Sequence, residues 1–179
     1  MILVTGASGQ LGQLIVSSLL ARGVAADSIV AAVRSPEKAT NLKDLGVQVR
    51  KADYTDTASL SAAMEGVKRV VLVSSSEVGQ RAVQHQNVIN AAKAANVELL
   101  AYTSILHADT SPLALAEEHK QTEAALSASG IPRVLLRNGW YSENYTMSAG
   151  MAVEHGAVLG SAGEGKYATA TRADYADAA

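Results

Sequence analysis

The chain has 179 residues, of which 48% are apolar and 18% are charged, and it contains no cysteine. At this length a single domain buries roughly 70% of the surface of its unfolded chain, so we expect a packed core and not a disordered protein. The lack of cysteine excludes a disulfide scaffold and thiolate metal sites. A formal net charge of −2 gives no support for a nucleic-acid-binding surface. No apolar run has the length of a membrane span, and the N-terminus lacks the basic start of a signal peptide, so we expect a cytoplasmic protein.

Short apolar runs alternate with longer segments of helical periodicity. Several of the runs are apolar at consecutive positions, which is typical of strands covered on both faces. The alternation predicts a parallel sheet with right-handed crossovers, a Rossmann-like doubly wound α/β fold. The predicted strands are Ile2–Thr5, Ile29–Val33, Val47–Arg50, Arg69–Ser74, Glu98–Ser104 and Arg133–Arg137. The predicted helices are Gln10–Arg22, Glu37–Leu45, Thr57–Glu65, Val78–Ala95 and Leu113–Ser129.

Glycines and the end of the chain complete this pattern. Four glycines that each follow a helical segment predict left-handed C-caps: Gly23, Gly46, Gly66 and Gly130. After Gly150 the pattern weakens. Val158-Leu159 has the composition of a short strand, and 160–165 has that of a loop. The segment Thr171–Ala179 has the pattern of a short helix, for which we expect apolar partners beyond residue 179.

The clearest motif is a glycine-rich stretch between the first predicted strand and the first predicted helix. Its glycines, Gly6, Gly9 and Gly12, have separate roles in a dinucleotide-binding loop. Gly6 permits a sharp turn, Gly9 lets the backbone approach a pyrophosphate, and Gly12 lets the helix pack closely. The free N–H groups at the helix start then face the phosphates. The alternative is a structural turn that binds no ligand.

The residue that ends the second predicted strand bears on cofactor selectivity. An acidic residue at that position would accept a hydrogen bond from a ribose 2′-hydroxyl and favour NAD. Here the residue is Arg34, a fixed cation suited to a 2′-phosphate, which favours NADP(H). The alternative is a solvated surface arginine. Asp53, after the third strand, is interpreted either as an acceptor for the adenine amine or as a turn residue.

Three stretches carry a family resemblance: Thr5–Gly12, Val73–Arg81 and Leu136–Tyr145, with support from Tyr102–Ser104 and Ala170–Tyr175. Through them the whole chain resembles the NmrA-like group of atypical short-chain dehydrogenases. More closely, it is similar to the bacterial NADPH-dependent quinone oxidoreductases of type 2. Members of that family are longer. The resemblance therefore implies an NADP-binding Rossmann domain over 1–150 and the start of an incomplete, apparently truncated, substrate-binding region over 151–179.

The resemblance also implies a role for each part of a cofactor site. Arg34 would hold the 2′-phosphate. The remaining candidate residues follow carboxyl ends of predicted strands, the sheet edge where ligands bind. The pyrophosphate would lie on Gly6, Ala7, Ser8, Gly9, Gln10 and Leu11, and the nicotinamide-side ribose on Ser74, Ser75 and Ser76. The nicotinamide would be covered by Asn138, Gly139, Trp140, Tyr141, Ser142 and Glu143.

Two of these groups have plainer alternatives. The alternative for the three serines is that they form the polar end of a strand and bind no ligand. The aromatic residues Trp140, Tyr141 and Tyr145 form either a ligand-facing wall or a core stripe. Aromatic residues are only 4% of the chain, yet three of them gather in this stretch, so we favour the ligand-facing interpretation.

The sequence lacks the Tyr-x-x-x-Lys pair that supplies the acid in typical short-chain dehydrogenases, because Leu106 stands four residues after Tyr102. A quinone is a strong hydride acceptor, so its reduction mainly requires that the quinone and the nicotinamide be held at reacting distance. The absence of the Tyr-x-x-x-Lys pair therefore fits a quinone reductase. His107 and His119 follow the fifth strand, but a lone histidine is more often a surface or capping residue. We therefore assign no catalytic residue and no metal site.

The sequence favours an NADPH-dependent oxidoreductase with a small quinone as its partner, without nucleic acid or membrane. The alternative is a non-catalytic NADP-binding redox sensor of the NmrA-like type that docks a partner protein. A methyltransferase of the same fold class is a third hypothesis, and it would normally have an acidic residue at the position of Arg34. The sequence leaves the oligomeric state open.

Overall fold

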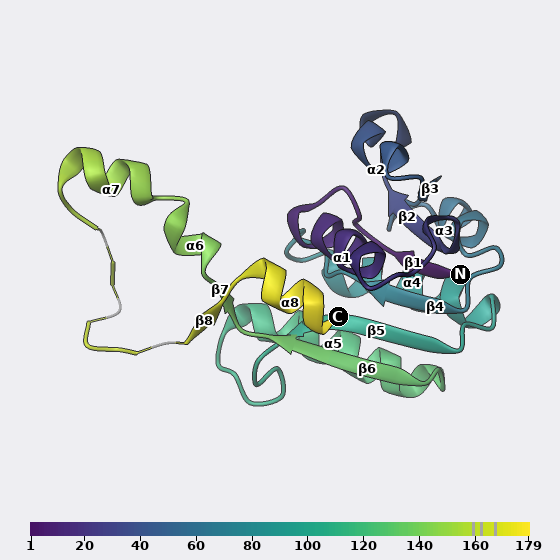
Figure 1. The fold of residues 1–179 in the computed structure, drawn as a ribbon. Helices are drawn as coiled ribbons and strands as arrows, with labels where there is room; N and C mark the ends of the chain where they lie inside the picture. Colours follow the sequence, from purple (N-terminus) through teal and green to yellow (C-terminus); the bar gives the residue numbers. More distant parts are fainter. Residues whose placement is uncertain (159, 162, 167) are drawn as a thin grey trace.

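The structure is a computed structural model that describes residues 1–158, 160–161, 163–166 and 168–179. Six parallel strands form one sheet in the order β3-β2-β1-β4-β5-β6, which confirms the predicted doubly wound fold (Figure 1). The strands are β1 Ile2–Val4, β2 Ile29–Val33, β3 Gln48–Lys51, β4 Arg69–Leu72, β5 Leu99–Ile105 and β6 Arg133–Asn138. The main helices are α1 Gln10–Ala21, α2 Thr40–Asp44, α3 Thr57–Ala63, α4 Arg81–Ala94, α5 Ala114–Ser129 and α8 Arg172–Ala178.

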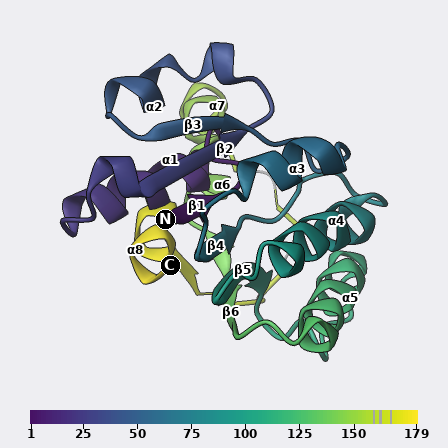
Figure 2. The ribbon, with the colours of Figure 1, turned by 90° about the vertical axis from the view of Figure 1, so that its right-hand side faces the viewer.

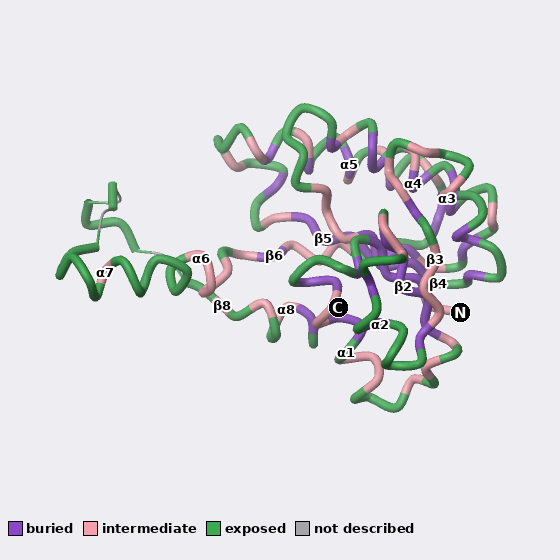
Figure 3. The backbone as a smooth tube through the Cα atoms, turned by 90° about the horizontal axis from the view of Figure 1, so that it is seen from above, coloured by how far each residue is buried: buried purple, intermediate pink, exposed green. Residues whose placement is uncertain are grey.

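Helices cover both faces of the sheet. Figure 2 shows α3, α4 and α5 on one face and α1 with α8 on the other. The strands that lie between these layers are apolar on both sides; β2, for example, is buried at all five positions. Buried residues gather along the sheet and the inward faces of its helices, whereas α6 Glu143–Thr146 has no buried residue and α7 Ala149–His155 is largely exposed (Figure 3).

Two predicted helices differ in their boundaries. The helix expected over Glu37–Leu45 is divided into a 3₁₀ turn at Pro36–Lys38 and the short α2. The helix expected from Val78 begins at Arg81, because Gly79 has a left-handed φ of +84° and breaks the first turn. The four predicted glycine caps are confirmed: Gly23, Gly46, Gly66 and Gly130 have φ values of +85°, +78°, +68° and +78°.

The last part of the chain forms a small second sheet. The strands β7 Trp140–Tyr141 and β8 Thr169–Ala170 pair in parallel, and α6 and α7 lie between them in sequence. The expected strand at Val158-Leu159 is not formed at Val158, and Leu159 lies outside the described residues.

Helix α8 is stabilised within this chain. Thr171 and Asp174 form a capping box at its start, and Ala176 is buried in the core cluster that also holds Ile15 of α1. The expectation that its apolar partners lie beyond residue 179 is therefore wrong, because α1 provides them. Within the described residues, no helix combines the length and the apolar character needed to span a membrane.

Candidate functional site

A cleft of about 1210 Å³ lies at the carboxyl ends of the central strands. Open α/β sheets bind their ligands at this edge, where the strand order reverses between β1 and β4. The cleft brings together thirteen of the sixteen predicted site residues. They are Gly6, Ser8, Gly9, Gln10, Leu11, Arg34, Ser74, Ser75, Ser76, Asn138, Gly139, Trp140 and Tyr141.

The glycine loop has the shape that a phosphate needs. Gly6 has a left-handed φ of +56°, which turns the chain from β1 toward α1. A Cβ on Gly12 would lie 2.3 Å from the Gly6 carbonyl oxygen, so only glycine allows the helix to approach the loop this closely. A Cβ on Gly9 would meet only that same oxygen, at 3.2 Å, and the rest of its surroundings are open. Gly9 therefore exposes backbone to the cleft.

The N-terminus of α1 offers hydrogen-bond donors at the same place. The first turn of a helix has N–H groups without partners inside the helix, and they carry a partial positive charge. In α1 no side chain caps them, and the N-cap residue is Gly9 itself. The residues present thus fit a pyrophosphate, which would satisfy these donors.

Tyr54 is a cleft residue that the sequence analysis missed. Its hydroxyl lies 2.5 Å from Thr5 Oγ1 and 2.7 Å from the Val73 carbonyl oxygen. Thr5 Oγ1 in turn accepts from the Val73 N–H at 2.9 Å. These contacts tie the ends of β1 and β4 together beneath the glycine loop. A lone tyrosine after a strand gives no signal of this role in the sequence.

Arg34 lies at the mouth of the cleft and pairs with Glu77. Its Nη1 is 3.3 Å from Glu77 Oε1, and both side chains are largely exposed. The other oxygen of Glu77 accepts from Gln84 Nε2 at 2.7 Å. Asp53 lines the cleft nearby, and its carboxylate accepts from the N–H and the hydroxyl of Thr55, which lowers the pKa of Asp53. The turn interpretation of Asp53 is therefore correct, and its contact with adenine stays a prediction.

The serine loop after β4 is fixed by buried polar groups. The N–H of Ser74 donates to Thr103 Oγ1 at 2.8 Å, and the N–H of Ser75 donates to His85 Nε2 at 2.9 Å. Arg81 Nε donates to the Ser75 carbonyl oxygen at 2.7 Å, while Arg81 Nη1 pairs with Glu118 at 2.7 Å. The loop is thus held rigidly against α4 and α5.

This support was also missed by the sequence analysis. Its members Arg81, Gln84 and His85 are buried polar residues on α4. They recur at the i, i+3 and i+4 spacing of one helix face. Polar residues on a helix face that must cover a sheet are the signal that could have found them.

The segment after β6 forms the other end of the cleft. Asn138 is buried and donates through Nδ2 to the Tyr141 hydroxyl at 3.2 Å. The Gly139 N–H donates to the Tyr175 hydroxyl at 2.9 Å, and a Cβ on Gly139 would collide with that hydroxyl at 2.7 Å. Trp140 lines the cleft with 51% of its surface exposed.

The aromatic residues in this segment have different roles. The Tyr141 ring packs edge-on against Tyr175, with the guanidinium of Arg172 4.6 Å from its centroid. Tyr145 does not line the cleft. Trp140 and Tyr141 thus line the cleft and Tyr145 does not, while contact of these rings with a ligand stays a prediction.

Three predicted site residues have structural contacts and do not line the cleft. Ala7 is fully buried, and its N–H donates to the Ala32 carbonyl oxygen. Ser142 donates to Thr169 Oγ1 at 3.0 Å. Glu143 accepts from the Arg172 N–H at 2.9 Å. The last two hold β7 and β8 together, so their direct contact with a cofactor stays a prediction.

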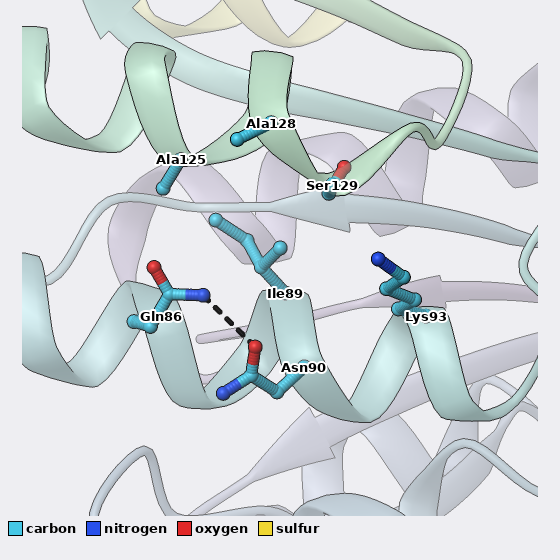
Figure 4. A pocket seen from close by; sticks show the side chains of 7 residues that line it. All are labelled: Gln86, Ile89, Asn90, Lys93, Ala125, Ala128 and Ser129. Atoms are coloured by element: carbon cyan, nitrogen blue, oxygen red, sulfur yellow. Dashed lines mark hydrogen bonds between the residues drawn. The ribbon is translucent and has the colours of Figure 1, made fainter.

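A second, smaller hollow of about 150 Å³ lies between α4 and α5, away from the strand ends (Figure 4). Ile89 and Lys93 of α4 point toward Ala125 and Ser129 of α5. None of the predicted site residues lines it. Among the described residues, no cluster of three or more His, Asp or Glu side chains could hold a metal ion.

The fold and the cleft together are those of a nucleotide-binding protein, and the chain belongs to the NAD(P)H-binding family, whose model matches residues 6–179. Among curated proteins, it is 62% identical to quinone oxidoreductase 2 of Escherichia coli K12 over all 179 residues. It is 30% identical over 152 residues to an NmrA-like family domain-containing oxidoreductase of Aspergillus flavus.

Solved structures give the same picture. The chain matches the NADPH-dependent quinone oxidoreductase of Escherichia coli complexed with NADPH at a TM-score of 0.94 and 61% identity, over 98% of this chain and 62% of that one. It matches the triphenylmethane reductase of Citrobacter sp. complexed with NADP(H) at a TM-score of 0.95 and 39% identity, over 99% of this chain and 63% of that one. The chain thus spans 62% of the length of the Escherichia coli protein and 49% of that of the Aspergillus flavus one.

Proposed function

We propose that this chain is the cofactor-binding part of an NADPH-dependent oxidoreductase that reduces a quinone. One observation carries the proposal: the 62% identity to the Escherichia coli quinone oxidoreductase extends over every residue of the chain and so includes the whole cleft. Arg34 at the end of β2 supports NADPH over NADH, because a guanidinium suits a 2′-phosphate.

The cleft residues divide the binding of NADPH among them. The N-terminus of α1 and the glycine loop would hold the pyrophosphate, and Arg34 the 2′-phosphate. The serine loop at Ser74–Ser76 and the segment from Asn138 to Glu143 would hold the nicotinamide half. When bound, NADPH supplies the hydride; the protein orients the two reactants and excludes water between them.

The substrate side of the cleft is the part that reaches toward the second sheet. Trp140, Met147 and Leu113 line it with apolar surface that suits a flat acceptor. We also infer that 1–150 is the NADP-binding domain and that 151–179 begins the substrate-binding region. The exposed apolar side chains Met151 and Val153 support this division.

The test is NADPH consumption by the intact protein with 1,4-benzoquinone, followed by the loss of nicotinamide absorbance. We expect turnover with NADPH and much slower turnover with NADH. The Gly9→Val variant serves as the matched control, since it should not bind either cofactor. Tight binding of NADPH without consumption in the presence of several quinones would instead support the sensor that docks a partner protein.

A further inference from the structure

A buried tyrosine–histidine pair lies at the wall of the cleft and has no part in the cofactor contacts described above. The Tyr102 hydroxyl is 2.7 Å from His119 Nδ1. Tyr102 is fully buried on β5, and His119 on α5 is 3% exposed. The expectation that this histidine is a surface or capping residue is therefore wrong.

The contact between Tyr102 and His119 bears on which nitrogen of His119 carries the proton. The Tyr102 hydroxyl lies 2.7 Å from Nδ1 of His119, and it also interacts with the side chains of Thr122 and Ser74. A histidine that accepts through Nδ1 carries its hydrogen on Nε2. Burial lowers the pKa of His119 to about 4, so the ring is neutral at pH 7 and has one N–H.

The Nε2 atom of His119 opens onto the cleft. His119 is one of the residues that line the cleft, and its one hydrogen bond within the described residues runs through Nδ1. Among the described residues, every fully buried side-chain nitrogen or oxygen has a hydrogen-bond partner, whereas Nε2 of His119 has none. Nε2 is therefore not enclosed by protein, and when it carries the ring hydrogen its N–H is free to donate to a ligand in the cleft.

The position of this donor matches the reacting end of the cofactor. In a doubly wound sheet the two halves of a dinucleotide lie over the two halves of the sheet. The glycine loop and Arg34 lie over β1 and β2, which leaves β4, β5 and β6 for the nicotinamide half. His119 lines the same cleft as Ser104 of β5 and Asn138 of β6.

We propose that His119 is a catalytic residue that donates a hydrogen bond from Nε2 to the quinone oxygen on which negative charge develops, with Tyr102 as the positioning residue that fixes its tautomer. This inference rests on the proposed function. The quinone gains a hydride at one oxygen as NADPH is oxidised to NADP⁺. The electron pair moves through the ring to the other oxygen, which then takes a proton from water to complete the hydroquinone. His119 keeps its own proton and stabilises the charge, as a neutral donor in an oxyanion hole does.

The first test is the tautomer of each buried histidine, measured in the intact protein by ¹⁵N NMR of the imidazole rings. His85 is the internal reference, because its Nε2 accepts from the Ser75 N–H and its Nδ1 therefore carries the hydrogen. We expect the Nε2–H form for His119 and the Nδ1–H form for His85. Tyr102→Phe should give a tautomer mixture at His119 alone. An Nδ1–H form of His119 in the unsubstituted protein would overturn the inference.

The second test uses kinetics to separate the effect of the Nε2 donor of His119 from that of its Nδ1 contact with Tyr102. In His119→Gln the side-chain amide reaches the position of Nε2, and in His119→Asn it reaches only that of Nδ1, toward Tyr102. We expect kcat for benzoquinone to fall about 10- to 100-fold in His119→Asn and to be largely rescued in His119→Gln. The Kd for NADP⁺, measured by titration, should stay within twofold in both, which also verifies that they are folded.

The outcomes distinguish the two proposals. An unchanged kcat in His119→Asn, with normal turnover in the unsubstituted protein, would refute the role of His119 and leave the quinone reductase intact. An unsubstituted protein that binds NADPH but reduces no quinone would refute the proposed function, and the role of His119 with it. Addition of hydroquinone and NADP⁺ should shift the Nε2–H resonance of His119 and leave the Nδ1–H resonance of His85 in place.

Discussion

The guanidinium of Arg34 and the carboxylate of Glu77 lie 3.3 Å apart, one at the end of β2 and the other in the loop after β4. Glu77 is held from its other side by Gln84. A 2′-phosphate that binds Arg34, as we propose, would therefore compete with Glu77 for one cation.

Arg34→Ala should weaken NADPH binding far more than NADH binding. A charge-assisted hydrogen bond contributes roughly 1.5–3 kcal/mol, which corresponds to about a 10- to 150-fold rise in Kd. Calorimetric titration with both cofactors measures the difference. Equal losses for NADPH and NADH would contradict the assignment of Arg34 to the 2′-phosphate.

Glu77→Gln should have the opposite effect. It removes the competing carboxylate, so we expect the Kd for NADPH to decrease a few-fold at low salt, with NADH unaffected. The gain should shrink as salt screens the exposed charges. A weaker binding of NADPH in this variant would mean that Glu77 supports the site and does not compete for Arg34.

Gly9→Val and Gly12→Val should separate binding from folding. Gly9 has φ −78° and open surroundings, so valine fits the backbone there but places a branched Cβ where a phosphate must approach. We expect loss of NADP⁺ binding with a nearly unchanged melting temperature. In Gly12→Val the Cβ would overlap the Gly6 carbonyl, so the protein itself should be destabilised. Near-normal binding of NADP⁺ by Gly9→Val would show that the loop is a structural turn that does not hold the pyrophosphate.

The stability of the protein should decrease as the pH falls below about 6.5, the pKa of histidine in an unfolded chain. Burial lowers the pKa of His85 to about 3 and that of His119 to about 4. Arg81 acts on both rings in the same direction, whereas Glu118 and Glu123 oppose it at His119. Below pH 6.5 the unfolded chain therefore binds protons that the folded chain excludes.

Between pH 7 and pH 5 this linkage should cost about 2 kcal/mol of unfolding free energy for each of the two histidines. Urea unfolding at several pH values measures it, and His119→Gln should remove about half of the slope. An unfolding midpoint that is independent of pH in this range would show that the two rings are not buried as neutral groups.

Trp140→Ala should raise the KM for the quinone, because Trp140 is an exposed aromatic ring on the wall of the cleft. Tyr145→Ala is the matched control, since Tyr145 belongs to the same segment but does not line the cleft. Steady-state kinetics with a series of quinones measures both. An equal effect of the two substitutions would point to a general disturbance of the segment.

Glu118→Gln should destabilise the protein by about 3–5 kcal/mol, because it leaves the buried guanidinium of Arg81 without its carboxylate. Glu118 also accepts from the N–H groups of Gly79 and Arg81 at the start of α4. Chemical denaturation measures the loss. A change below about 1 kcal/mol would place this pair among ordinary surface ion pairs.

The sequence was sufficient to predict the fold and the glycine loop of the cleft. Consecutive apolar residues in β2 and β5 predicted buried parallel strands, and the three glycines predicted the loop, because both features follow from local backbone and burial rules. The start of α4 was misplaced because Gly79, which has a left-handed φ, breaks the turn before Arg81. Glu118 of α5 accepts from the N–H groups of Gly79 and Arg81, and local propensity contains no information on such a contact.

The polar layer under the cleft could not be predicted for a related reason. Tyr102 and His119 come from a strand and a helix, and they meet only when α5 packs on the sheet. Similarly, the docking of α8 on α1 joins segments more than 150 residues apart, as in the hydrogen bond of 2.5 Å from Ser18 to Asp177. Neither pairing leaves a periodic or spaced pattern in the sequence.

The parallel pairing of β7 with β8 brings the two ends of a long excursion side by side. The chain leaves the body of the protein at Tyr141 and re-enters it at Thr169, and no residue of α7 lines the cleft. Closing a loop costs free energy that grows only slowly with its length. The outer part of the excursion can therefore lengthen, shorten or change its sequence at little energetic cost, while the pairing of β7 with β8 keeps its two ends beside the cleft.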